Sequence, residues 1–100
     1  MTVPFGRTVR LKCTTSLKVY PDWTHNSIPL FVNGEIDINQ QSQYSVDKSV
    51  SGQYDLVLEN VTAAEAGLYE CLDEAGFGPV LATYFLTVRG NYEQESQCYI

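Results

Sequence analysis

Apolar and polar residues alternate in several short stretches of this chain. In residues 9–13, Val9, Leu11 and Cys13 are separated by an arginine and a lysine, and residues 54–61 repeat this kind of pattern. Such alternation is typical of a strand whose side chains point in turn toward a core and toward solvent. Both stretches are therefore predicted to be strands.

The same alternation of inward and outward positions predicts two more strands. Val19, Pro21 and Trp23 are separated by single residues, so we expect all three to face the core from one strand. Residues 83–88 form another apolar and polar run, in which Leu86 is expected to point inward. The Gly-Phe-Gly-Pro sequence before that run is typical of a tight turn, because glycine and proline supply its backbone geometry.

Two cysteines, a tryptophan and a tyrosine occur at characteristic positions in these predicted strands. Cys13 and Trp23 are followed by the run Glu65-Ala-Gly-Leu-Tyr69-Glu-Cys71, in which the tyrosine stands two residues before the cysteine. From about residue 3 to residue 88 the chain thereby resembles the immunoglobulin superfamily. The resemblance implies an all-β Greek-key sandwich of two antiparallel sheets, with Cys13 bonded to Cys71 across them. It also implies a core in which Trp23 packs on that bridge and the Tyr69 hydroxyl bonds back to the backbone.

Within that family, the chain departs from the variable-type pattern in two ways. The positions that usually carry an arginine and aspartate pair hold Gln43 and Glu65, so the pair is not expected. The interval between the two cysteines is also shorter than in variable domains and nearer to the intermediate type. We prefer a variable-like (V-set) domain with a short middle over the intermediate (I-set) type, because residues 28–36 supply an additional strand and turn.

Size and charge fit one extracellular domain at residues 1–89, followed by a polar tail or linker at 90–100. The chain has 100 residues and a net charge of −6, which argues against nucleic acid or an anionic membrane as a partner. No apolar run reaches the roughly 18 residues of a membrane-spanning helix, and no secretion signal is present at the N-terminus. Met1 directly before a strand suggests a piece cut from a longer secreted or cell-surface protein.

The third cysteine and one glycosylation motif add to this interpretation. Cys98 has no partner if Cys13 and Cys71 pair, so it either forms an intermolecular disulfide or is a tail cysteine without one. Asn60-Val-Thr is the motif for an N-linked glycan, although the same residues also suit the end of a strand. A disulfide and a glycan on Asn60 would both belong to the extracellular environment.

Enzyme chemistry is not predicted. His25 is the single histidine, so it would have to support a catalytic triad alone, and a structural role for it is favoured. Asp73-Glu74 and residues 37–39 supply too few oxygens at regular spacing for a calcium loop. We expect no cofactor and no metal.

A sheet face is the predicted binding surface. In the immunoglobulin fold the strands holding Trp23, Cys71 and residues 83–88 share one sheet, and the extra strand at 28–36 extends it. Exposed apolar patches on such a face usually mark a partner. The residues predicted to contribute are Tyr20, Leu30, Phe31, Val32, Leu72 and Phe85.

We therefore interpret the chain as an extracellular recognition module of a receptor or adhesion protein. Its partner is another protein or a second copy of the chain. Two alternatives stay open: an immune-type receptor domain that binds through loops 25–28, 35–41 and 73–79, and a structural spacer in a receptor such as a receptor tyrosine kinase. Apolar outward residues favour a binding role over the spacer.

Overall fold

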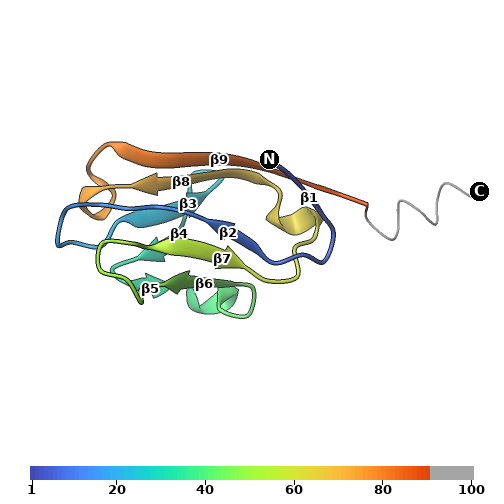
Figure 1. Ribbon diagram of the computed structural model, residues 1–100, viewed down its shortest axis with the longest axis horizontal. Helices are drawn as coiled ribbons and strands as arrows, with labels where there is room; N and C mark the ends of the chain where they lie inside the picture. The colour runs from blue at the N-terminus through green and yellow to red at the C-terminus, as the bar shows by residue number, and fades with distance from the viewer. Residues whose placement is uncertain (91–100) are drawn as a thin grey trace, which may run out of the picture.

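Two β-sheets face each other in this computed structural model, which describes residues 1–90 (Figure 1). The larger sheet has six strands in the order β1-β9-β8-β3-β4-β5, and the smaller has three in the order β2-β7-β6. The strands are β1 (Thr2–Pro4), β2 (Val9–Leu11), β3 (Asp22–His25), β4 (Ile28–Val32), β5 (Glu35–Ile36), β6 (Tyr44–Asp47), β7 (Asp55–Leu58), β8 (Gly67–Leu72) and β9 (Val80–Arg89). Three 3-10 helices join them: η1 (Ile38–Gln40), η2 (Ala63–Glu65) and η3 (Glu74–Gly76).

The pairing within each sheet is antiparallel, with one exception. β1 runs parallel to β9, with Thr2 opposite Thr87, and the sequence pattern did not predict this pair. The additional strand predicted within 28–36 is present as the β4–β5 hairpin. Its two-residue turn consists of Asn33 and Gly34, which both have positive φ, at 58° and 83°. This conformation suits asparagine and glycine and matches the twist of the paired strands.

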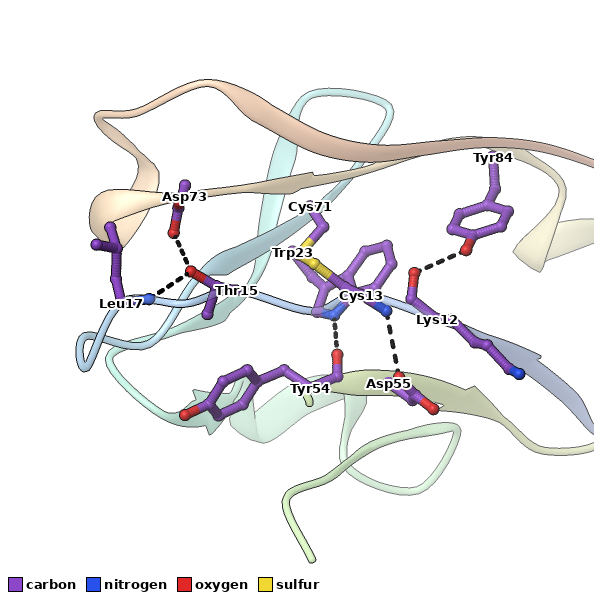
Figure 2. Close-up of a disulfide and its surroundings, with 10 residues drawn as sticks. All are labelled: Lys12, Cys13, Thr15, Leu17, Trp23, Tyr54, Asp55, Cys71, Asp73 and Tyr84. Atoms are coloured by element: carbon purple, nitrogen blue, oxygen red, sulfur yellow. Dashed lines mark hydrogen bonds between the residues drawn. A yellow bond between two sulfur atoms is a disulfide. The ribbon is translucent and has the colours of Figure 1, made fainter. Parts of the chain in front are cut away.

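The predicted disulfide forms the centre of the core. Cys13 and Cys71 are joined by a 2.06 Å bond across a sequence separation of 58 residues. Trp23 is fully buried and pairs with Cys71 between β3 and β8, so its ring lies beside the bridge, as Figure 2 shows. The indole Nε1 donates a hydrogen bond to the Tyr54 carbonyl at 2.8 Å, which satisfies the only polar group of this side chain.

The corner before β8 is fixed by a second buried aromatic. Tyr69 is fully buried, and its hydroxyl donates to the backbone carbonyl of Glu65 at 2.5 Å, as the resemblance implied. The Tyr44 hydroxyl lies 2.9 Å from that of Tyr69.

The Glu65 carboxylate accepts from the backbone N–H and the hydroxyl of Thr62, and so closes a capping box rather than pairing with Gln43. His25 has the structural role expected of it, because its ring stacks on Tyr69 at 4.3 Å.

The prediction that Val19 faces the core was wrong, and so was the assignment of Leu30 and Phe31 to the binding face. Val19 is 50% exposed, because β3 begins only at Asp22 and the strand parity does not extend back to it. Leu30 and Phe31 are adjacent yet both buried, because the β3–β4 register shifts between Trp23 and Thr24 and so turns successive side chains of β4 inward.

Candidate protein-binding face

The solvent side of the larger sheet can be derived from its register. Trp23, Cys71 and Ala82 are aligned across β3, β8 and β9 and point toward the smaller sheet. Neighbouring residues along each strand must therefore point away from it. We call this surface the outer face; it comprises Asp22, Thr24, Val32, Leu68, Glu70, Leu72, Val80, Thr83 and Phe85.

Apolar side chains occupy both ends of the outer face on β8 and β9. Leu68 is opposite Phe85, and Leu72 is opposite Val80. Phe85 is 66% exposed and Val80 is 48% exposed, whereas the two leucines are half-buried beside them. Each of these cross-strand pairs presents apolar surface to solvent.

Polar residues lie between the two apolar pairs. Glu70 stands in the middle of β8, opposite Thr24 on β3 and Thr83 on β9. Thr24 is buried although it points outward, and its Oγ1 has no hydrogen-bond partner among the described residues; the same is true of Oδ1 of Asp22. Burial raises the pKa of Asp22 above its usual range, because a carboxylate loses hydration there.

Loop η3 covers part of Asp22. A Cβ atom on Gly76 would lie 2.8 Å from Oδ2 of Asp22, and Gly76 has a φ of +92°, which side chains rarely adopt. Only glycine allows this close approach of the loop to the carboxylate without rearrangement. The loop at 73–79 therefore borders the outer face where β8 ends.

Three of the six predicted binding residues lie on the outer face: Val32, Leu72 and Phe85. Leu30 and Phe31 do not, because they belong to the core. Tyr20 does not either. Its ring packs edge-on against Tyr54, with centroids 5.5 Å apart. The ring also covers Gly34, while the Nζ of Lys48 lies 5.5 Å from its centroid. Tyr20 therefore contacts residues near the smaller sheet and not the outer face.

The predicted binding residues omitted Leu68, Glu70 and Val80. Strand parity around Cys71 was enough to place the first two outward, whereas the position of Val80 depends on the register shift between Cys71 and Leu72.

The three loops proposed as an alternative binding site do not converge. His25 pairs with Tyr69 near the start of β8, whereas residues 73–79 follow the end of that strand. Loops 25–28 and 35–41 do meet around a hollow of about 250 Å³ whose lining includes His25, Ile28, Asp37 and Gln40. A single loop surface of the antigen-receptor kind is therefore not formed.

Other predicted features fall outside this face. Asn60 is exposed just after β7 of the smaller sheet, and Cys98 lies outside the described residues. Within residues 1–90 no group of three His, Cys, Asp or Glu side chains is placed to hold a metal ion. The helices in this part of the chain are single 3-10 turns, and none could cross a bilayer.

Comparison with known proteins identifies the fold. No family model matches the sequence, and no curated protein does either. The crystal structure of Dpr11 IG1 bound to DIP-gamma IG+IG2 contains a chain with 23% identity and a TM-score of 0.74, over 88% of this chain and 95% of that one.

Two further solved structures show the range of proteins that share this fold. The ZIG-8 IG1 homodimer matches with 18% identity and a TM-score of 0.70, over 88% of this chain and 76% of that one. Titin domain M7 matches with 17% identity and a TM-score of 0.67, over 90% and 85% of the two chains. The chain therefore has the immunoglobulin fold, as the sequence predicted.

Proposed function

We propose that this chain is an extracellular recognition module that binds another protein through the outer face of its larger sheet. The observation that carries the proposal is the exposed apolar surface of Leu68, Leu72, Val80 and Phe85. Phe85 is 66% exposed beside Leu68, and a second apolar pair, Leu72 and Val80, lies further along the same face. Exposed apolar patches of this kind usually mark an interaction site.

The known structures of this fold support a protein partner. Dpr11 IG1 is bound to domains of DIP-gamma, and ZIG-8 IG1 forms a homodimer. By analogy, the partner here is another immunoglobulin domain, in the same cell-surface setting or on a second cell. The Cys13–Cys71 disulfide supports an oxidising, extracellular location.

The second candidate function is a structural spacer. Its support is the similarity to titin domain M7, which shows that the fold alone does not distinguish a spacer from a recognition module. The two functions differ in what the outer face does. If the chain is a spacer, it has no ligand at the outer face. A charge introduced at Phe85 should then change no interaction of the domain.

The experiment is a binding screen with a matched control. The domain, assembled as a pentamer to raise avidity, is applied to a panel of immunoglobulin-domain ectodomains from the same organism, including itself. Phe85→Asp removes apolar area from the outer face. Val50→Asp introduces the same charge at a 55% exposed site in the turn between β6 and β7 of the smaller sheet.

We expect at least one ectodomain to retain the unmodified domain and the Val50→Asp variant but not the Phe85→Asp variant. Circular dichroism should show both variants folded, because neither side chain is in the core. Binding that survives Phe85→Asp would remove the outer face from the proposal. Absence of any binding across the panel would favour the spacer.

We also propose that Asn60 carries an N-linked glycan. It is exposed beyond the end of β7, so a glycan there would leave the outer face of the other sheet uncovered. Expression in a secretory host should give a mass that falls on treatment with an N-glycosidase. The Asn60→Gln variant should show no such change.

A further inference from the structure

We infer that the outer face is built for a partner whose contacting surface is basic and rich in hydrogen-bond donors, and not for a second copy of this chain. The inference rests on the proposed function and names the chemistry of the partner.

Carboxylates outnumber basic side chains on the strands of the larger sheet. The six strands of the larger sheet carry three carboxylates, Asp22, Glu35 and Glu70, and a single basic side chain of the lysine and arginine class, Arg89. Arg89 is six residues beyond Thr83, the position opposite Glu70, so it lies about 20 Å along β9 from the centre of the face. The centre of the outer face is therefore acidic.

Arg10 of the smaller sheet and Lys48, which follows β6, are engaged elsewhere. Arg10 of β2 forms both ion pairs that occur within residues 1–90, with Asp47 at 3.0 Å and with Asp55 at 3.2 Å. Lys48 donates to the Gly34 carbonyl at 3.1 Å. Glu70 takes part in neither of these ion pairs, so its carboxylate is available to a partner.

Side-chain hydrogen-bond donors are few at the centre of the outer face. Its strands contain no lysine, asparagine or glutamine, and the Thr24 hydroxyl is buried, so the exposed donor at the centre of the face is the hydroxyl of Thr83. The acceptor there is the carboxylate of Glu70, which is half-buried and reaches solvent. Polar groups that lose water in an interface without gaining a partner weaken binding. A complementary surface must therefore supply donors.

A second copy of the chain does not supply these hydrogen-bond donors. In a two-fold contact each outer face meets its own equivalent, and Glu70 stands at the middle of the sheet, between Thr24 and Thr83. Self-pairing centred there brings two Glu70 carboxylates together and leaves both without cations. Like charges placed opposite each other act against association and so select between partners.

The edge of the sheet at β4 and β5 shows the same chemistry. A hollow of about 390 Å³ is lined by the apolar side chains of Val32, Ile36 and Ile38 and by the carboxylates of Glu35 and Asp37. Lysine and arginine combine an aliphatic stem with a cationic head. Such a side chain fits an apolar hollow with acidic residues at its border.

A charge-reversed copy of the chain is the probe for this inference. Sedimentation velocity is measured on the unmodified domain, on Glu70→Lys, and on their equimolar mixture, at low and at high salt. The mixture pairs an acidic centre with a basic one while the rest of each face is unchanged. Glu59→Lys is the control, because it reverses an exposed charge that follows β7 of the smaller sheet.

The mixture is expected to associate roughly tenfold or more tightly than either protein alone, and to weaken as salt increases. Phe85→Asp in both components should abolish this association, and a mixture with Glu59→Lys should behave as the unmodified domain does. Glu70→Gln, which removes the charge with little change in shape, should self-associate more tightly than the unmodified domain even if Glu70→Lys folds poorly.

Self-association of the unmodified domain as tight as that of the mixture would overturn the inference. If Phe85→Asp abolished that self-association, the proposed function would still stand, with a second copy as partner. Failure of both the mixture and Glu70→Gln to associate would also overturn the inference. The ectodomain panel would then decide the proposed function by itself.

Discussion

The paired hydroxyls of Tyr69 and Tyr44 allow a quantitative test of how the corner before β8 is stabilised. Tyr69→Phe keeps the buried ring and removes only the hydroxyl. It leaves the Glu65 carbonyl without its donor and the Tyr44 hydroxyl without its neighbour, both in buried surroundings. An unsatisfied buried polar group costs about 1 to 3 kcal/mol, so we expect Tyr69→Phe to lower the free energy of unfolding by about 2 to 3 kcal/mol.

Tyr44→Phe should cost less, about 1 kcal/mol, because Tyr69 keeps its bond to the Glu65 carbonyl. In the double variant, the Tyr44 hydroxyl that Tyr69→Phe leaves unpaired is also removed. The cost of the double variant should therefore be smaller than the sum of the two single costs by about 1 kcal/mol. Tyr84→Phe is the control, because it removes a hydroxyl that bonds the Lys12 carbonyl at an exposed site, and should change stability by no more than about 0.5 kcal/mol.

The assay is urea unfolding with the disulfide intact, followed by intrinsic fluorescence, with the slope of the transition checked for each variant. Equal effects of Tyr69→Phe and Tyr84→Phe would show that burial of the corner hydroxyl does not matter. Strictly additive single and double effects would show that the two buried hydroxyls do not act together.

The same pair gives a prediction for alkaline pH. Burial raises the pKa of Tyr69 and, to a smaller extent, that of Tyr44 above the ordinary value of 10.0. The folded chain therefore holds protons that the unfolded chain releases, so stability should fall as pH rises above about 10. In the double variant this fall should be shallower, which urea unfolding between neutral and alkaline pH would measure.

Three further predictions concern the core and the outer face. Mass spectrometry of the unreduced protein should show the peptides of Cys13 and Cys71 linked; a map that joins Cys98 to either of them would contradict the fold. Trp23→Ala should lower the free energy of unfolding by about 3 to 5 kcal/mol, because it opens a large cavity beside the disulfide, and a near-native urea midpoint would refute this. Burial raises the pKa of Asp22, so its ionisation should oppose folding as pH rises from below its ordinary pKa of 3.8 through its higher folded value. Asp22→Asn should therefore raise the urea midpoint at pH 7 more than at pH 3, and an equal change at both would show that the charge is not responsible.

Much of the fold could be predicted because its core residues have specific chemistry. Two cysteines, one tryptophan and a tyrosine at fixed spacing restrict the chain to very few arrangements. Strand parity around Cys71 correctly pointed Leu72 outward, and parity around Leu86 did the same for Phe85. Parity failed where strands are irregular. The register shift in the β3–β4 pair buries Leu30 and Phe31 together, and no sequence pattern marks that shift.

The chemistry of the candidate site was less predictable, because it depends on which strands share a sheet. Asp22, Glu35 and Glu70 are far apart in the sequence and give no local charge run. They form an acidic surface only once β3, β5 and β8 are placed in one sheet while Arg10 and Lys48 are placed elsewhere. Tyr20 shows the same dependence on tertiary structure, because its ring turns toward Tyr54 and not along the strand parity.

The unpaired polar atoms bear on the choice between a recognition module and a spacer. Asp22 and Thr24 lie on β3, an inner strand of the larger sheet, where an apolar residue or a paired polar one would stabilise the domain better. In a spacer, selection acts on stability alone. It would not be expected to keep a carboxylate at Asp22, because burial there disfavours the charged form. A binding face is different, because local rules are commonly broken where function requires it. The cost at Asp22 therefore favours a recognition module over a spacer.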